Sequence, residues 1–217
     1  ANVTGVLPTF NTDFTGYTTG ETDNGDGTYT VSITTDSLAN LPTSIKFDQQ
    51  YANDLRLLTV DKLRITSSIT DMKYMFRNNR ALTYVNTDGW DTSNVTNMYN
   101  TFYGCYELTS LDVSGFDTSN VTTMGMMFTH CHNLTSIDLS GFDTNKVTDM
   151  GRMFQQCNAL TSLDFSNFNT SLVPYMDYMF EECRSLTILD LSGFDTSEVI
   201  NMDSMFSGCT NLTTLDI

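Results

Sequence analysis

Apolar and polar residues recur along most of the chain at a fixed interval of 26 residues. The clearest column is a phenylalanine column with no drift in its spacing, made of Phe76, Phe102, Phe128, Phe154, Phe180 and Phe206. Cysteine and leucine columns follow it in the same register. A fixed period of this length is typical of stacked-repeat proteins, in which each unit buries its apolar face only against its neighbours.

Within one repeat, two different periodicities follow each other. Leu111 and Val113 alternate with polar residues, which predicts a short strand. A turn follows at residues 114–119. The next apolar residues, Met124, Met127, Phe128 and Cys131, are spaced as on one face of a helix. The pattern therefore predicts a right-handed, leucine-rich-repeat-like α/β solenoid, in which each repeat contributes a strand, a turn and a short helix.

The first 54 residues do not follow the repeat. Tyr29, Val31 and Ile33 alternate with polar residues and predict a half-buried strand. The segment 23–27 is rich in Asn-Gly and Asp-Gly steps, which favour a tight turn over a calcium loop because the distal glutamate is missing. We therefore expect a β-rich N-terminal cap over residues 1–54. The solenoid follows over residues 55–217, with one degenerate repeat first and a truncated one last.

Charge excludes several classes of partner. The chain has 26 acidic and 10 basic residues, a formal net charge of −16. A nucleic-acid binder needs clustered Lys and Arg, and an anionic membrane surface would repel this chain. No apolar run is long enough to span a bilayer. The sequence starts at Ala1 without a charged and apolar leader and stops within a repeat. We therefore expect any secretion signal to be missing or already removed, and the chain to be part of a longer polypeptide.

The sequence offers little for catalysis or metal binding. No Gly-rich phosphate loop, nucleophile elbow or zinc-protease motif occurs, so we expect no enzymatic activity. The five cysteines occupy one column of the repeat, which favours buried free thiols over disulfides. A zinc site at His130, Cys131 and His132 is disfavoured, since no second pair completes four ligands. The methionine columns are interpreted as core.

The segment 108–131, L-T-S-L-D-V-S-G-F-D-T-S-N-V-T-T-M-G-M-M-F-T-H-C, resembles the 26-residue repeat of the BspA-like leucine-rich-repeat surface proteins of bacteria. The resemblance extends over about residues 60–217. It departs locally, for example where Asn79 stands in the cysteine column. The resemblance implies a secreted or cell-surface bacterial protein, and several members are adhesins. It brings no catalytic motif and no agreed ligand-contact residues.

Outward positions of the predicted strands form columns of serine and aspartate. A column of carboxylates about 4.8 Å apart is repulsive. Either each Asp bonds its flanking Ser or backbone, or the columns bind a cation such as calcium, a basic patch or sugar hydroxyls. Aromatic residues outside the core columns cluster in the early rungs at Tyr84, Tyr99, Tyr103 and Tyr106, and Tyr84 and Tyr106 are added as candidate contacts. The candidate ligand-binding residues are Ser110, Asp112, Ser114, Ser136, Asp138, Ser140, Ser162, Asp164, Ser166, Asp190, Tyr84 and Tyr106. A second column, Asp91, Asp117, Asp143, Asn169 and Asp195, is expected to cap turns.

The sequence therefore favours a monomeric adhesin that binds a host extracellular protein, mucin or glycan, without a cofactor. The alternative is a structural spacer that holds a distal binding domain away from the cell wall. The spacer predicts no ligand, whereas the adhesin predicts saturable binding that substitutions on one face abolish.

Overall fold

The computed structural model describes residues 17–23, 29–35, 59–60, 63 and 65–217. Strands β1 (Tyr17–Asp23) and β2 (Tyr29–Thr35) pair antiparallel in a hairpin. β2 confirms the strand predicted around Val31. The tight turn expected at 23–27 and most of the expected cap at 1–54 lie outside the described residues.

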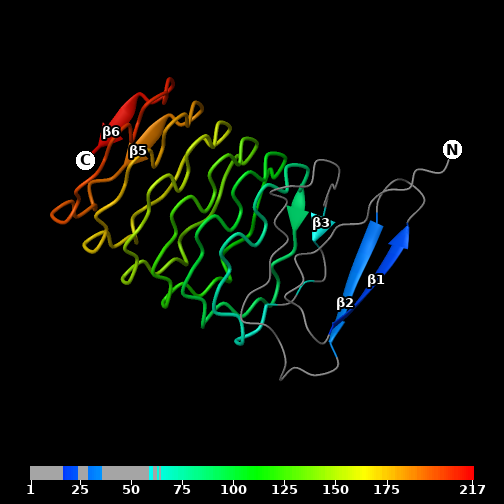
Figure 1. Cartoon of the computed structure of the whole chain (residues 1–217). Coiled ribbons are helices and arrows are strands. Elements are labelled where there is room, and N and C mark those ends of the chain that lie inside the picture. The colour runs from blue at the N-terminus through cyan, green and yellow to red at the C-terminus, as the bar shows by residue number, and fades with distance from the viewer. Residues whose placement is uncertain (1–16, 24–28, 36–58, 61–62, 64) are drawn as a thin grey trace.

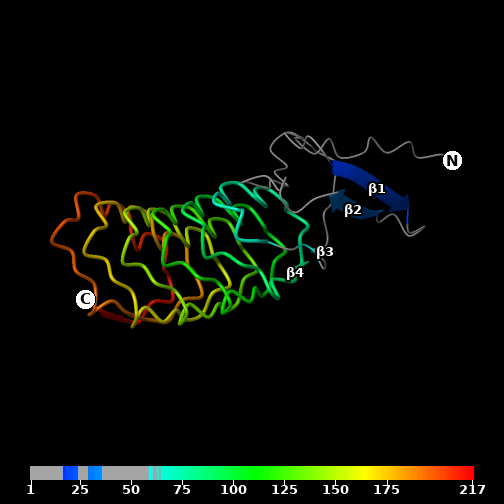
Figure 2. The ribbon, with the colours of Figure 1, turned by 90° about the horizontal axis from the view of Figure 1, so that it is seen from below.

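From residue 65 onward the chain forms a stack of similar coils, which we call rungs (Figures 1 and 2). Parallel pairing links β3 (Thr59–Val60) to β4 (Tyr84–Val85), and β5 (Ile188–Asp190) to β6 (Thr214–Asp216). Between these pairs, single parallel bridges join residues 26 apart, such as Asn97 and Thr123. The 26-residue period of the sequence is thus the length of one rung.

The predicted helix is wrong, because the described residues contain no helix. In the segment 124–131, the amides of Met127, Thr129 and Cys131 donate to the carbonyl three residues earlier. The intervening amides donate to the next rung: Met126 to Gly151 at 2.9 Å and Phe128 to Met153 at 2.9 Å. A helix would instead connect each amide to the carbonyl four residues earlier.

Backbone torsions show what replaces the helix. Met126 and His130 have φ of 56° and 62°, in the left-handed region that a right-handed helix does not visit. Each is the third residue of a hydrogen-bonded turn, where a type II turn requires positive φ. Overlapping turns bury residues at spacings of three and four, as a helix does, so Met124, Met127, Phe128 and Cys131 are all fully buried. The same spacing of apolar residues is therefore compatible with a helix and with a series of overlapping turns.

The α/β solenoid is accordingly corrected to a stack of hydrogen-bonded turns and short extended segments. Neighbouring helices pack about 8–10 Å apart, whereas backbone hydrogen bonds hold these rungs at the spacing of adjacent strands, about 4.8 Å. Helices do not fit that spacing. On the side of the stack where strands were predicted, the described residues form regular strands only in the two end pairs, β3–β4 and β5–β6. The prediction that the side chains of Leu111 and Val113 point inward is nevertheless confirmed, since both are buried.

The core is built from columns of identical side chains. Phenylalanine rings of successive rungs stack with centroids 5.4–6.2 Å apart and planes within 18°, from Phe76 to Phe206. Burying one such ring contributes about 1.5–3 kcal/mol. A second column stacks Trp90 on Phe116 at 5.8 Å. Each rung therefore covers the apolar face of the one before it.

The cysteine column confirms the prediction of buried thiols. Cys105, Cys131, Cys157 and Cys183 are buried, and none of the five cysteines is in a disulfide. Each Sγ donates to a phenylalanine carbonyl of the previous rung, as Cys131 does to Phe102 at 3.2 Å. Burial raises the pKa of Cys131 to about 12. These thiols pack as small hydrophobic residues and stay protonated.

A buried threonine column supplies side-chain links between the rungs. The hydroxyl of Thr118 donates to the carbonyl of Asp143 at 3.0 Å and accepts from the amide of Asp143 at 2.7 Å. Thr92 makes the same pair of bonds to Asp117, and Thr144 to Asn169. One hydroxyl thus satisfies both backbone groups of a residue in the next rung.

No helix in the described part of the chain could cross a membrane.

We expect Thr118→Val to lower the free energy of unfolding by about 1–3 kcal/mol, because it leaves both backbone groups of Asp143 without their partner. Thr118→Ser is the control, since serine keeps the hydroxyl, and it should lose less. Urea denaturation of the three proteins checks this. Equal stability of Thr118→Val and wild type would contradict the role of the hydroxyl.

Candidate functional site

Three outward surfaces run along the stack. The Asp–Ser face comprises residues 84–88 and their equivalents 110–114, 136–140, 162–166 and 188–192. The corner comprises 91–93 and its equivalents 117–119, 143–145, 169–171 and 195–197. The turn face comprises 71–80 and its equivalents 97–106, 123–132, 149–158, 175–184 and 201–210.

On the Asp–Ser face, the aspartates cap their own turns. Oδ1 of Asp112 accepts the Ser114 amide at 2.9 Å and the Ser114 hydroxyl at 2.6 Å. Asp138, Asp164 and Asp190 accept the corresponding amides of Ser140, Ser166 and Ser192 at 2.9 Å. Hydrogen bonds from Ser114 lower the pKa of Asp112, and the same cause lowers the pKa of the other three. Turn capping therefore accounts for an aspartate in each of these four rungs.

This face also brings some of the predicted residues together. Ser136, Asp138, Ser162 and Asp164 line a shallow hollow of about 380 Å³ between two rungs, with Ile137 and Leu163 at its base. Ser110 lies one rung earlier in the same column and is exposed. Tyr84 is 48% exposed at the first rung of this face. Tyr106 belongs to the turn face, so these two tyrosines lie on different surfaces.

The corner confirms the expected turn caps. Asp117 Oδ1 accepts the Ser119 amide at 3.0 Å, and Asn169 accepts the Ser171 amide at the same distance. An amide oxygen thus replaces a carboxylate oxygen here without loss of the bond. The negative charge at these positions is incidental to capping.

The turn face differs from the other two surfaces because its outward residues change from rung to rung. One column reads Lys73, Tyr99, Gly125, Gly151, Asp177 and Asp203. Five of the six lysines and arginines beyond residue 70 lie on this face: Lys73, Arg77, Arg80, Arg152 and Arg184. Six of the seven tyrosines beyond residue 70 also lie here: Tyr74, Tyr99, Tyr103, Tyr106, Tyr175 and Tyr178. Comparing the outward columns of the repeats would have identified this face from the sequence.

Aromatic and cationic side chains contact one another along the first rungs of the turn face. Tyr106 stacks on His132 with ring centroids 4.5 Å apart, and Tyr103 meets His130 edge-on at 5.2 Å. The Arg80 guanidinium lies 5.2 Å from the centre of the Tyr106 ring. Burial lowers the pKa of His130, whose Nδ1 lies 3.0 Å from Oε1 of Gln156. This cluster is pre-ordered and presents aromatic surface beside positive charge.

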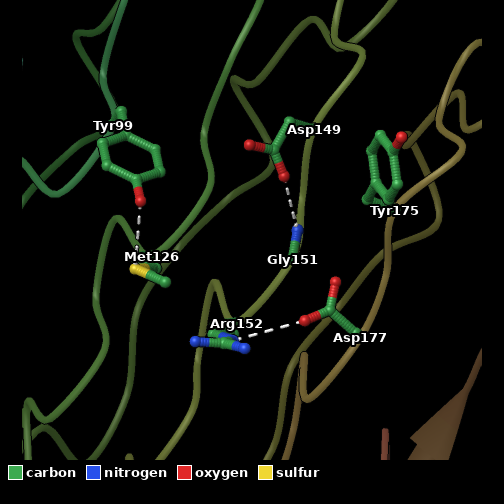
Figure 3. A pocket seen from close by; sticks show the side chains of 7 residues that line it. All are labelled: Tyr99, Met126, Asp149, Gly151, Arg152, Tyr175 and Asp177. Carbon is green, nitrogen blue, oxygen red and sulfur yellow. Dashed lines mark hydrogen bonds and ion pairs between the residues drawn. The ribbon is translucent and has the colours of Figure 1, made fainter. Parts of the chain in front are cut away.

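Further along the turn face lies a second hollow, of about 290 Å³ (Figure 3). Its walls include Tyr99, Asp149, Arg152, Tyr175 and Asp177. Arg152 Nε is 3.3 Å from Asp177 Oδ2. Oδ1 of Asp149 accepts the Gly151 amide at 3.0 Å. Desolvation raises the pKa of Asp149, in contrast to the lowered values on the Asp–Ser face.

A family model described as "Mycoplasma protein of unknown function, DUF285" matches residues 70–163 and again residues 135–216. Together the two matches cover more than half of the chain. The chain belongs to the DUF285 family. Its matched region, residues 70–216, contains the whole turn face and the whole Asp–Ser face. No curated protein and no solved structure matches this DUF285 chain.

The aspartate columns are one of the cation sites that the sequence suggested. Among the described residues, no three His, Cys, Asp or Glu side chains are grouped so that they could hold a metal ion. His130 and His132 contact each other at 5.6 Å between ring centroids, and Cys131 between them is buried. The aromatic and cationic residues of the turn face are therefore the richer candidate site of this DUF285 chain.

We expect Asp149→Asn to raise the melting temperature at pH 7 by a few degrees, since about 1 kcal/mol shifts the Tm of a chain of this size by about 2–4 °C. The raised pKa means that the folded state binds the proton more tightly than the unfolded chain, so ionisation above that pKa disfavours the fold. Asparagine caps the same turn in other rungs, where Asn97 accepts from Tyr99 at 3.0 Å and Asn201 from Asp203 at 2.9 Å.

The control is Asp112→Asn, which removes a carboxylate whose pKa is lowered, and it should not raise the melting temperature. Melting curves at pH 7 and at pH 3 check both. The gain from Asp149→Asn should shrink at pH 3, where the wild-type carboxyl is protonated. A lower melting temperature for Asp149→Asn at pH 7 would contradict the desolvation argument.

Proposed function

We propose that this chain is a binding module of a bacterial surface protein, and that it recognises an extracellular protein or glycan through the turn face. One observation carries the proposal. Outward residues repeat on the Asp–Ser face and the corner, where they cap turns, but they change from rung to rung on the turn face. Residues that only maintain a stack of identical rungs have no reason to differ.

The kind of residue on the turn face supports binding. Tyrosine and arginine dominate the energetics of protein interfaces, because they offer large, rigid surface with a polar end. Here they are held by their neighbours, as Tyr103 is by His130. Pre-ordered side chains lose little conformational entropy when a ligand binds.

Charge along the turn face favours a protein as the ligand. Its first rung carries Lys73, Arg77 and Arg80, whereas a later rung carries Asp177, Glu181 and Glu182. A surface with both signs in separate regions selects a partner with the complementary arrangement. A neutral glycan would gain little from it. The net charge of −16 further favours basic partners.

The resemblance to BspA-like surface proteins supports an extracellular location. The cysteine column is compatible with an oxidising environment, because burial raises the pKa of Cys157 and Cys183, and desolvation also raises the pKa of the half-buried Cys209. A spacer role is the competing proposal. The uniform rungs favour it, but it gives no account of the variable aromatic face.

The proposal is tested by binding of the chain to immobilised extracellular-matrix proteins, mucins and glycans. The turn-face variant Tyr103→Thr/Tyr106→Asn takes residues that already occupy these columns, at Thr129 and Asn158. Because each tyrosine contributes about 2 kcal/mol when it is an interface hot spot, we expect the variant to lose at least about tenfold in affinity.

The matched control is Tyr84→Ser/Asp112→Asn on the Asp–Ser face, again with residues found in those columns, at Ser110 and Asn86. It should bind as the wild type does. Loss of binding in the control alone would move the site to the Asp–Ser face. Absence of saturable binding to every ligand would support the spacer.

A further inference from the structure

The hollow beside Asp149 lies where two successive rungs carry glycine on the turn face. In the column that holds Lys73, Tyr99 and Asp177, the two middle rungs carry Gly125 and Gly151. The hollow opens over Gly151, with Tyr99 on one side and Tyr175 on the other (Figure 3). Gly125 is buried next to the carboxylate of Asp149, which lines the hollow. Its volume of about 290 Å³ is enough for one small organic group.

The glycines also make room for carboxylates. A Cβ at residue 125 would lie 2.6 Å from Oδ2 of Asp149, and a Cβ at residue 151 would lie 3.0 Å from Oδ1 of Asp177. Any side chain at residue 125 would therefore displace Asp149 from its present position. With glycine at residues 125 and 151, the carboxylates of Asp149 and Asp177 can both lie at the hollow.

Asp149 holds a charge that nothing nearby neutralises. Its hydrogen-bond partners are the Gly151 amide at 3.0 Å and the Thr123 hydroxyl, which donates to Oδ2 at 3.4 Å. No ion pair in the described part of the chain involves Asp149. The nearby Arg152 is instead paired with Asp177, and its guanidinium lies 4.8 Å from the centre of the Tyr178 ring.

The charge is also unnecessary for the turn. Asn97 and Asn201 cap the equivalent turns in other rungs without one. A partly desolvated carboxylate with no cation is unfavourable for the fold. Its surroundings complement a cation that arrives from outside.

The walls favour an organic cation over a metal ion. Aromatic faces attract ammonium groups through the ring quadrupole and also pack against their methylene carbons. Tyr99 is held in place by its hydroxyl, which donates to Sδ of Met126 at 3.4 Å. Tyr175 is 45% exposed and free to pack on a ligand. A metal ion would need several oxygen ligands together, which this hollow does not group.

We propose that the hollow between Tyr99 and Tyr175 binds an alkylammonium group, the lysine side chain of a protein partner, with Asp149 as its counter-ion. The ammonium group donates to the carboxylate of Asp149, and the methylenes lie against the tyrosine rings. This inference rests on the proposed role of the turn face as a binding surface, and it names one anchor of the partner.

The test is an NMR titration of the ¹⁵N-labelled chain with Nα-acetyl-lysine N-methylamide. The Gly125 and Gly151 amides should shift saturably, with a dissociation constant in the millimolar range expected of a single side chain. The same compound acetylated at Nε, which has lost its charge, should cause no saturable shift. Tetramethylammonium is a second arm, since tighter binding of it than of the lysine compound would overturn the assignment to a lysine side chain.

Asp149→Asn should raise the dissociation constant at least about tenfold, because it removes one partner of a charge pair. The control Asp138→Asn makes the same change of net charge on the Asp–Ser face and should leave binding unchanged. An equal loss of affinity in both variants would show that only the overall charge matters, and it would overturn the proposal. Saturable shifts with methyl glucoside but not with the lysine compound would overturn it as well.

The titration uses a small probe, and its outcome is separate from that of the macromolecular screen. The screen varies Tyr103 and Tyr106, which lie outside this hollow. A failed titration with a positive screen would remove the lysine anchor and leave the binding face. A failed screen with a positive titration would leave the cation site and remove the proposed macromolecular function.

Discussion

The hydrogen bond between the backbones of successive rungs is the constraint on which the rest of this structure depends. Amides on the turn face donate to carbonyls 25 residues later, as Met126 does to Gly151 and His130 to Gln155. This bonding fixes the rung spacing near that of adjacent strands. At that spacing the phenylalanine rings stack, the threonine hydroxyls reach the next backbone, and helices are excluded. It also holds Met126 and His130 at positive φ, which an isolated chain would avoid.

A stack of this kind separates structural residues from residues that are free to vary. Inward columns must repeat, because each rung packs only on its neighbours. Aspartates at the turns also repeat, because each caps a backbone amide. On the turn face, the column of Asp71, Asn97, Asp149 and Asn201 caps turns as well. The other outward positions have neither duty, so tyrosines, arginines, histidines and glycines appear there in different rungs. Variable outward residues are therefore concentrated on a surface whose backbone amides bond to the next rung, and the hollow beside Asp149 opens over Gly151 on that surface.

The sequence predicted the rung length, the buried columns, the thiols and the corner caps, because each follows from a period and a residue type. It predicted the wrong local structure for residues 124–131, since overlapping turns and a helix bury the same spacing of side chains, and only the partner of each amide distinguishes them. Capping by the flanking serine or backbone was one of the two explanations that the sequence offered for the aspartate columns, and Asp112, Asp138, Asp164 and Asp190 do cap turns. The site that we propose lies instead in the irregular columns around Tyr103 and Asp149. The hollow itself could not be predicted, because it depends on how the side chains of Tyr99, Asp149 and Tyr175 are oriented around it.

The most direct test of this account is the detection of scalar couplings across hydrogen bonds by NMR in the deuterated chain. The amides of Met126, Phe128 and His130 should couple to the carbonyls of Gly151, Met153 and Gln155 in the next rung. Couplings to the carbonyls four residues earlier, at Thr122, Met124 and Met126, would show a helix instead. That result would contradict the stack of turns and the turn face built on it.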